Sequence, residues 1–549
     1  MRGRGRGGGR RRVTGAALLV ETLRTHGVKQ IFSLSGNQIL SVYDATIGRD
    51  IALVHTRHEA AATHMADGWG RLTETPGVAL VTAGPGHLNA VSALYSALMA
   101  ESPMVLLSGH APRAQRGRGA FQEIDQAGAA RPVVKAAWVA ESAEGLGNDI
   151  ARAFAVANSG RPGPVHVSLP GDLLEAKLTE PIAVPPPTRL EVMRLPDAAI
   201  RRMLDLFAEA KRPLILLGPA MARARRRQIV DRLGEITRVP ALVMESPRGV
   251  NDPALHGAAS CLPDADLVLL LGKAADYSVR FAQPPAFAPG ARLARIDIDA
   301  MTPPSASERF VLSVAADPEI ATAQLVDAAR ERAWQRSAWT DEVAQARATL
   351  PAEWAAHARA DRAPLHPLRV CAAIQRHVRD ETLLVIDGGE FGQWAQAALD
   401  GGTRLINGLS GSIGSAIPLA LAAKVAHPGR PVVAIVGDGT FGFHAMEMDT
   451  AVRYRLPIVV IVGNDARWNA EHQLQLQHYG EARAVACALL PTRYDRLVEG
   501  LGGHGEHVER AEELEPALAR AVASGKPACV NVMIDGVAAP TYRRGPGAH

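Results

Sequence analysis

Two apolar segments near the C-terminal end of the chain, each followed by a turn rich in oxygen-bearing side chains, constrain the fold most strongly. Residues 431–436 (PVVAIV) lead into 437–440 (GDGT), and residues 456–462 (LPIVVIV) lead into 463–465 (GND). The intervening residues 445–454 have the pattern of a crossover helix, so the segment predicts a βαβ unit whose strand ends share one edge of a parallel sheet. Glycines let the backbone approach a phosphate closely, and carboxylate and amide oxygens suit Mg²⁺. The segment predicts a diphosphate site held through a metal; the alternative is an ordinary turn in which Asp438 caps a helix.

The alternation of short apolar runs with helical patterns extends over the whole chain. It predicts an α/β protein with three doubly wound parallel-sheet domains, at residues 13–180, 190–330 and 365–540. A proline-rich linker at 181–187 separates the first two domains, and a charged, alanine-rich helical stretch at 317–362 leads into the third. Strands are expected at 30–34, 77–82, 104–107, 163–170, 213–218, 241–244, 267–272 and 293–298, besides the two above.

Composition excludes several classes of function. Aromatic residues make up only 4% of the chain, which argues against stacking platforms for nucleic acid, so nucleic acid is an unlikely partner. No apolar run approaches the roughly 20 residues that a membrane-spanning helix needs. The cysteines form no C-x-x-C pair and are expected to be buried thiols in a reducing, cytoplasmic compartment; they are Cys261, Cys371, Cys487 and Cys529.

The net charge of +4 comes from the N-terminal end. Six arginines and no acid occur within residues 1–12, and without them the net charge is 4 − 6 = −2. Such a segment cannot bury apolar surface, so we expect a disordered basic arm. A solvated tail is the favoured interpretation, and a weak tether to an anionic surface is the alternative.

A second group of polar residues lies in the first predicted domain, at 57–71 (RHEAAATHMADGWGR). A zinc site of the H-E-x-x-H type is excluded, because the second histidine would have to stand at Ala62. Glu59 is then either a helix-start charge that complements the helix dipole or a functional carboxyl group. The residues that follow, 82–86 (TAGPG) and Asn89, favour the second interpretation once the chain is compared with known families.

Together these motifs resemble the thiamine diphosphate-dependent enzymes of the acetolactate synthase and pyruvate oxidase group, in collinear order over nearly the whole chain. The resemblance names the three domains as pyrimidine-binding, central and diphosphate-binding. It implies that Mg²⁺ binds Asp438, Asp465 and the main-chain oxygen of Arg467. This chain departs from the family at Asp465, where asparagine is usual. Cofactor contacts are implied for Gly437, Asp438, Gly439, Thr440, Asn464, Gly86 and Asn89.

The resemblance also implies catalytic residues. Glu59 would hydrogen-bond the aminopyrimidine ring of the cofactor and relay its protons, which favours deprotonation of the thiazolium carbon. Ile413, in 411–418 (GSIGSAIP), would support the bent cofactor, with plain core packing as the alternative. Gln122, in 119–123 (GAFQE), and Gln38 would orient the substrate. Benzaldehyde lyase-like relatives have a catalytic histidine at the position of Gln38, and a loop-capping amide is the other interpretation of this residue.

The implied function is decarboxylation of a 2-keto acid such as pyruvate and its joining to a second carbonyl compound, as in acetolactate synthases. The alternative is a benzaldehyde lyase-like, 2-hydroxyacyl-CoA or oxalyl-CoA lyase-type enzyme acting on an acyloin-type substrate. A non-enzymatic binding protein would not need Glu59 and Asp438. The family's active site is shared between subunits, which implies a homodimer or homotetramer. The ligand of the central domain stays open between FAD, an ADP- or CoA-type ligand, and none. Ala274 replaces an arginine that FAD-binding relatives carry.

Overall fold

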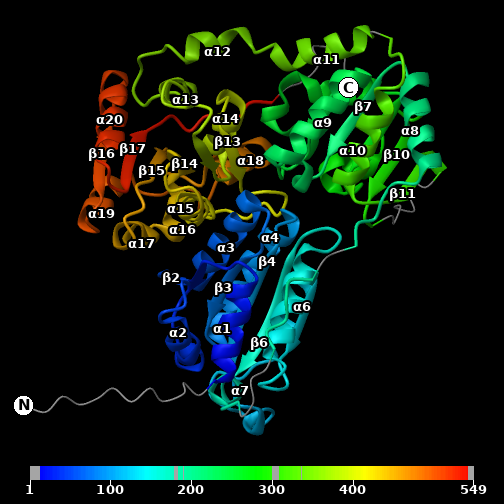
Figure 1. The fold of residues 1–549 in the computed structure, drawn as a ribbon. Coiled ribbons are helices and arrows are strands. Elements are labelled where there is room, and N and C mark those ends of the chain that lie inside the picture. The colour runs from blue at the N-terminus through cyan, green and yellow to red at the C-terminus, as the bar shows by residue number, and fades with distance from the viewer. Residues whose placement is uncertain (1–12, 179–182, 189–190, 300–307, 336, 542–549) are drawn as a thin grey trace, which may run out of the picture.

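The structure is a computed structural model that describes residues 13–178, 183–188, 191–299, 308–335 and 337–541. It contains three parallel β-sheets, each covered by helices, which confirms the predicted fold class (Figure 1). The sheets lie inside the three predicted domain ranges, whose boundaries stay predictions. The predicted basic arm at 1–12 and part of the proline-rich linker lie outside the described residues.

The first domain is a six-stranded sheet in the order β2-β1-β3-β4-β6-β5. Its central strand β4 is buried along its whole length, as expected of a parallel strand with helices on both faces. The strands are β1 (Gln30–Ser33), β2 (Ala52–His55), β3 (Gly77–Val81), β4 (Met104–His110), β5 (Ala136–Val139) and β6 (Pro164–Pro170). The main helices are α1 (Gly15–Thr25), α2 (Leu40–Thr46), α3 (Glu59–Thr73), α4 (Pro85–Met99) and α6 (Leu146–Asn158).

The second domain has five strands in the order β11-β10-β9-β7-β8. The strand order reverses between β7 and β9, which places the ligand crevice of this type of sheet at their carboxyl ends. The elements are α8 (Asp197–Glu209), β7 (Pro213–Leu217), α9 (Ala224–Thr237), β8 (Ala241–Val243), β9 (Leu267–Leu271), β10 (Arg292–Asp297), β11 (Phe310–Ala315) and α10 (Pro318–Ala329).

The third domain repeats the architecture of the first, in the order β13-β12-β14-β15-β17-β16. Its strands are β12 (Leu383–Ile386), β13 (Thr403–Ile406), β14 (Val432–Gly437), β15 (Val459–Asn464), β16 (His504–Val508) and β17 (Ala528–Met533). Its helices include α13 (Pro367–Gln375), α14 (Glu390–Ala398), α15 (Ala416–Ala426), α16 (Asp438–His444), α17 (Glu447–Arg453), α18 (Asn469–Tyr479), α19 (Tyr494–Gly500) and α20 (Ala511–Ala523).

Two helical predictions differ from the structure. The crossover helix expected at 445–454 is present as α17, but a further helix, α16, precedes it and begins at Asp438 itself, where an acidic residue suits the positive end of the helix dipole. The stretch expected to be helical at 317–362 consists of α10, α11 (Ala338–Ala348) and α12 (Ala352–His357). Pro351 directly precedes α12, a position that ends one helix and favours the start of another.

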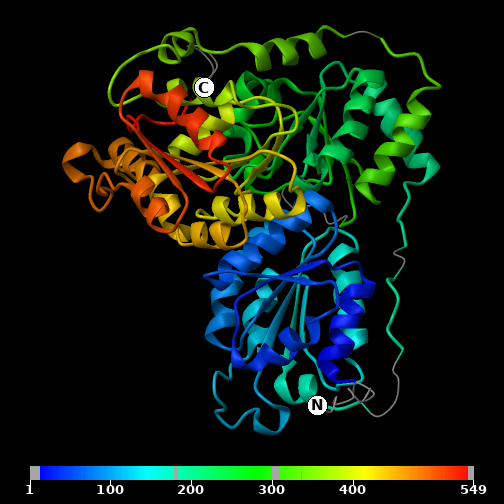
Figure 2. The ribbon, with the colours of Figure 1, turned by 60° about the vertical axis from the view of Figure 1, so that its left-hand side comes forward.

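The first domain packs beneath the other two, which lie side by side and are spanned by α11 and α12 (Figures 1 and 2). Helix α3 of the first domain lies on α15 of the third, where a Cβ atom at Gly68 would be 3.0 Å from the Ala422 Cβ. The contact contributes to one hydrophobic core that contains Phe32 and Met65 as well as Leu419 and Phe441. The four cysteines are buried thiols, as predicted. Within the described ranges, no helix is long and apolar enough to cross a bilayer.

Candidate active site

The carboxyl ends of β14 and β15 meet at one edge of the third sheet, as the sequence predicts. Gly437 and Gly463 are register partners in this pair of strands, so the residues that follow them lie next to one another. A small cavity opens at this edge. It brings together the predicted residues Ile413, Gly437, Asp438, Gly439, Thr440, Asp465 and Arg467, with Trp468 and the first turn of α14.

Two carboxylates form the charged end of this cavity. Burial raises the pKa of both Asp438 and Asp465, and the negative charge of Asp438 raises the pKa of Asp465 further. The backbone N–H of Arg467 donates to Asp438 Oδ2 at 3.2 Å. This bond holds the loop that contains Asp465 and Arg467 next to Asp438. Two neighbouring buried carboxyl groups either share a proton or bind a cation between them. Two carboxylates and a main-chain carbonyl fit a hard cation such as Mg²⁺.

Asn464 has a supporting position next to this pair. Its Oδ1 accepts from the Ala466 N–H at 3.1 Å, and its Nδ2 donates to the Thr492 carbonyl at 3.0 Å and to Asn531 Oδ1 at 3.1 Å. These bonds fix the loop that carries Asp465. The side chain is not among those that line the cavity, so the structure favours positioning over contact. The direct cofactor contact stays a prediction.

The other predicted catalytic carboxyl, Glu59, lies at the start of α3 in the first domain. The residue is only 8% exposed, and Asn89 Nδ2 donates to its Oε2 at 3.1 Å. Gly86 lies against the other carboxylate oxygen, because a Cβ atom there would be 3.1 Å from Glu59 Oε1. The structure therefore brings Glu59, Gly86 and Asn89 together. The carboxyl group is buried and is held at one oxygen by Asn89.

Glu447 of the third domain, which the sequence analysis did not single out, positions this helix start. Its Oε1 accepts from the backbone N–H groups of Arg57 (2.9 Å) and His58 (3.1 Å), directly before Glu59. Thr450 Oγ1 donates to the other oxygen at 2.6 Å. The side chain is 1% exposed. A residue of α17 thus fixes the backbone from which Glu59 projects.

The two predicted substrate-orienting glutamines are hydrogen-bonded to one another. Gln38 Nε2 donates to Gln122 Oε1 at 3.0 Å, and Thr82 Oγ1 donates to Gln38 Oε1. Gln122 has a φ of +59°, in the left-handed region that side-chain-bearing residues rarely adopt. Gly84 lies directly beneath it, since a Cβ atom at Gly84 would be 2.6 Å from the Gln122 carbonyl oxygen. The loop holds both amides at a defined place beside the Glu59 cluster.

Within one chain the two groups of residues do not share a cavity. Every described residue that lines the Asp438 cavity belongs to the third domain, whereas Glu59, Asn89, Gln38 and Gln122 belong to the first. Next to Gln122, the side chain of Phe121 is 70% exposed. Large apolar side chains are also exposed on α4 and α16, at Leu88, Tyr95 and Phe443. Such side chains at the edge of an incomplete site are typical of a surface covered by another copy.

Asp387 supports Ile413 and was also not predicted. It follows β12. Its carboxylate accepts from the backbone N–H groups of Gly414 (3.0 Å) and Ala416 (3.0 Å), which lie in the turn directly after Ile413. The Gly388 N–H donates to it as well, at 2.8 Å. Burial raises the pKa of Asp387 to about 6, against the opposing effect of these donors.

Replacing Asp387 with asparagine is expected to lower the stability of the third domain by about 2–4 kcal/mol, because an NH₂ group would then face backbone N–H donors in a buried position. Urea-induced unfolding of Asp387→Asn against the unmodified protein measures this loss. Asp380→Asn, the same change at an exposed acid between α13 and β12, is the control and should leave the unfolding midpoint unchanged. Equal midpoints for all three proteins would contradict this role.

A dinucleotide such as FAD would have to bind in the crevice of the second domain. At the carboxyl ends of β7 and β9, Gly218 and Gly272 approach so closely that a Cβ atom at Gly218 would be 1.8 Å from the Gly272 carbonyl oxygen. Lys273 is 1% exposed and pairs with Asp276 at 2.6 Å. The polar groups in this crevice are paired with one another.

The remaining hollow is lined by charges that are already paired. Arg161 binds Asp297 at 2.5 Å and Glu101 at 3.5 Å. The hollow measures about 40 Å³, whereas small-molecule sites commonly measure about 300–1,000 Å³. The described residues therefore do not fit FAD, in agreement with the replacement of the expected arginine by Ala274.

We expect the purified protein to carry no flavin. The visible absorbance of the native protein and the fluorescence of the supernatant after denaturation measure bound flavin directly. Added FAD should neither shift the thermal unfolding midpoint nor lose fluorescence on mixing. Stoichiometric flavin in the purified protein would show that the crevice opens.

Comparisons with known proteins agree with this arrangement. Three family models match the chain: the N-terminal TPP binding domain of thiamine pyrophosphate enzymes at residues 13–129, the central domain at 200–325 and the C-terminal TPP binding domain at 387–532. The acetolactate synthase large subunit IlvG of Mycobacterium tuberculosis is 36% identical over 537 residues, which cover 94% of this chain and 95% of that protein. The acetolactate synthase isozyme 3 large subunit of Escherichia coli is 31% identical, with 95% of each chain covered. The 2-hydroxyacyl-CoA lyase 2 of Homo sapiens is 30% identical, over 95% of this chain and 90% of that protein.

Proposed function

The chain belongs to the thiamine pyrophosphate enzyme family, and we propose that it is a Mg²⁺-dependent member that decarboxylates a 2-keto acid, such as pyruvate, and joins the remaining acyl group to a second carbonyl compound. The observation that carries the proposal is the Asp438–Asp465 pair with the Arg467 loop folded behind it, a cation site at the strand edge where a diphosphate would lie. The relatives named acetolactate synthase favour this reaction among those of the family.

Thiamine diphosphate, when bound, would supply a carbon that is nucleophilic after losing a proton, and a positively charged thiazolium ring that can accept the electron pair released with carbon dioxide. Asp438, Asp465 and the Arg467 carbonyl would hold the cation that binds its diphosphate. Glu59 would exchange a proton with the aminopyrimidine ring, while Asn89 fixes the carboxyl orientation. Ile413 would support the bent cofactor, and Asp387 holds the turn that carries Ile413.

The second candidate is cleavage of a 2-hydroxyacyl-CoA or an acyloin, with which the Gln38–Gln122 pair is also compatible. A neutral amide can bind a carbonyl or hydroxyl group of a substrate, but it is a poor acid or base. Several relatives of similar identity are named 2-hydroxyacyl-CoA lyase 2. The amide pair suits both a second keto compound and a hydroxyl-bearing substrate.

Pyruvate, supplied with saturating thiamine diphosphate and Mg²⁺, separates the two candidates. The synthase proposal expects acetolactate to form with turnover. If no acetolactate forms, that proposal fails, and cleavage of a 2-hydroxyacyl-CoA or an acyloin under the same conditions would select the lyase.

We further propose that the active site forms between two copies of the chain, so that a homodimer is the smallest active unit. The separation of the Glu59 cluster from the Asp438 cavity within one chain supports this, as do the exposed Phe121, Leu88 and Phe443 side chains near the two groups. A homotetramer built from two such dimers also agrees with these surfaces. Analytical ultracentrifugation should give no monomer at working concentrations. The four buried thiols support the expected cytoplasmic location.

A further inference from the structure

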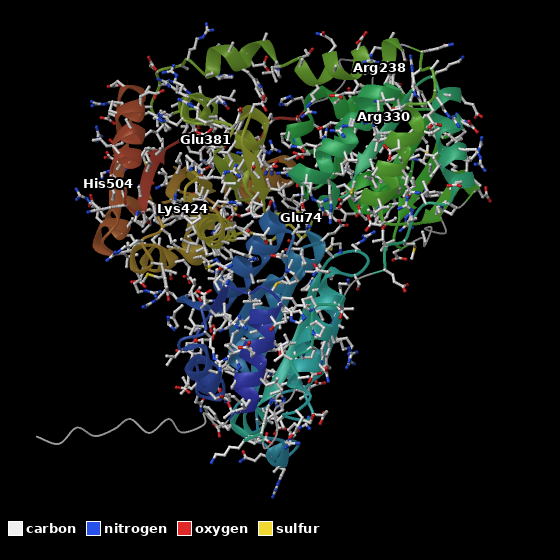
Figure 3. The ribbon with its side chains drawn as sticks, in the orientation of Figure 1. Glu74, Arg238, Arg330, Glu381, Lys424 and His504 are labelled. Atoms are coloured by element: carbon white, nitrogen blue, oxygen red, sulfur yellow. The ribbon has the colours of Figure 1, made fainter. Side chains whose placement is uncertain are left out.

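A larger cavity lies apart from the active site, where the three domains meet. Its volume is about 580 Å³, within the range of small-molecule sites. Its walls come from α3 of the first domain, from the loop after β7 with the start of α9 in the second, and from β13 of the third. Figure 3 places Glu74, one of its lining residues, at this junction. None of the acids proposed to hold the metal lines it.

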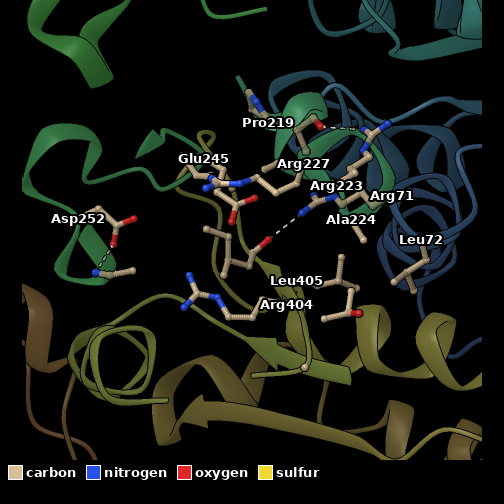
Figure 4. Close-up of a pocket in the computed structure, with 18 of the residues that line it drawn as sticks. Arg71, Leu72, Pro219, Arg223, Ala224, Arg227, Glu245, Asp252, Arg404 and Leu405 are labelled. Atoms are coloured by element: carbon tan, nitrogen blue, oxygen red, sulfur yellow. Dashed lines mark hydrogen bonds between the residues drawn. The ribbon is translucent and has the colours of Figure 1, made fainter. Parts of the chain in front are cut away.

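Arginine dominates the lining of this junction cavity. Figure 4 shows Arg71, Arg223, Arg227 and Arg404 around the same space, from elements far apart in the sequence. The complete set is Arg71, Arg223, Arg225, Arg227, Arg347 and Arg404, against the acids Glu74, Glu245, Asp252 and Asp400. Guanidinium groups from separate elements that converge on one space are typical of sites for phosphate or carboxylate, because each can present two parallel donors to such a group.

Some of these arginines are already neutralised and others are not. Arg71 pairs with Asp67, Arg225 with Glu74 and Glu319, and Arg227 with Asp231. In contrast, the bonds of Arg223 and Arg404 within the described part of the chain go to neutral carbonyls. Arg223 Nη2 donates to the Glu101 carbonyl at 2.5 Å, and Arg404 Nη1 donates to the Gln396 carbonyl at 3.2 Å.

Arg223 has a buried hydrogen-bond donor that no described residue satisfies. Its Nη1 is shielded from solvent and has no hydrogen-bond partner among the described residues. Burial lowers the pKa of Arg223 to about 10, and the charge of Arg226 adds to this effect. A buried guanidinium donor without a hydrogen-bond partner is costly, and an anion bound nearby would offset that cost.

The acids of the cavity limit which anion would fit. Burial raises the pKa of Glu245, while Arg404 opposes this effect. Asp252 is also buried, and its Oδ1 accepts from the Ala254 N–H at 3.0 Å. Carboxylates beside guanidinium groups would repel a bare polyanion but would accept hydrogen bonds from hydroxyl groups on the same ligand. The lining thus offers donors for phosphate and acceptors for a polyol.

We propose that the junction cavity is a binding site for a phosphate ester of a polyol, a class that includes nucleotides and sugar phosphates. Arg223, Arg347 and Arg404 would bind the phosphate oxygens, and Glu245 with Asp252 would accept from the hydroxyl groups. The site is separate from the diphosphate cavity and from the filled crevice of the second domain. It has its own charged groups.

Isothermal titration calorimetry with ATP, fructose 1,6-bisphosphate and inorganic tripolyphosphate tests this site. The holoenzyme is first saturated with thiamine diphosphate and Mg²⁺, so that the probes cannot bind at the diphosphate cavity, and free Mg²⁺ and ionic strength are held constant. We expect saturable binding of ATP or fructose 1,6-bisphosphate, and weaker binding of tripolyphosphate, which lacks hydroxyl groups. The double variant Arg347→Gln/Arg404→Gln should bind at least about tenfold more weakly.

Arg330→Gln is the control, because Arg330 is an exposed arginine directly after α10 that does not line the cavity (Figure 3). It should bind the probes as tightly as the unmodified protein. Failure of all three probes to bind saturably would overturn the proposal. Equal affinity in the double variant and the unmodified protein would also overturn it, and tripolyphosphate binding as tightly as both esters would refute the role given to Glu245 and Asp252.

Discussion

Replacing Glu59 with glutamine is expected to lower turnover by about 10²–10⁴-fold while thiamine diphosphate and Mg²⁺ still bind. Glutamine has nearly the same shape and keeps an oxygen that can accept from Asn89, so the pocket should stay formed. An amide cannot exchange a proton with the aminopyrimidine ring. Steady-state turnover measures the first effect, and calorimetric titration with the cofactor measures the second.

Glu144→Gln makes the same chemical change at an exposed acid of the first domain and should leave both quantities unchanged. If Glu59→Gln turns over like the unmodified protein, the carboxyl group has no part in proton transfer. If it instead loses cofactor binding, Glu59 is a structural residue whose loss disrupts the pocket.

The second large effect is an asymmetry between the two acids of the proposed metal site. Asp438→Asn is expected to weaken binding of thiamine diphosphate with Mg²⁺ by about 100-fold or more, because the asparagine oxygen would accept from the Arg467 N–H and leave an NH₂ donor toward the cation. Asp465→Asn should change the affinity by less than about tenfold. Asparagine is the residue usual at this position in the family, and its amide oxygen can still face the metal.

Calorimetric titration of both variants with thiamine diphosphate, at fixed Mg²⁺, measures the asymmetry. Each variant is the control for the other, since each change removes one negative charge from the same proposed metal site. Equal losses in both variants would show that net charge alone sets the affinity. A larger loss in Asp465→Asn would reverse the roles given to the two acids.

The strands and their ends were predictable because buried parallel strands are short apolar runs that are closed by glycine, proline or polar residues. The strand β14 starts one residue later than the apolar run that predicts it, at Val432. The strand β15 ends two residues later than its apolar run, at Asn464. The crossover between them was not predictable in detail, because hydrophobic periodicity does not show that a helix starts at Asp438 and breaks before Glu447.

The supporting residues of the site show where sequence patterns stop being informative. Asp387 was not predicted, although it directly follows an apolar run, the same position relative to a strand as Asp438, and this signal could have identified it. Glu447 has no such signal, since its role depends on a backbone 389 residues away along the chain. The hydrogen bond between Gln38 and Gln122 likewise depends on how two loops fold together.

The central claim is that Glu59 of one copy and Asp438 of another form one active site, and mixing two inactive variants tests it most directly. Glu59→Gln and Asp438→Asn chains are purified apart, each with negligible turnover, and then dissociated and reassembled together. Random pairing gives about half mixed dimers, each with one site that has both intact residues, so about a quarter of the unmodified activity should return. If no activity returns although mixed dimers are present by mass, the site does not form between two chains.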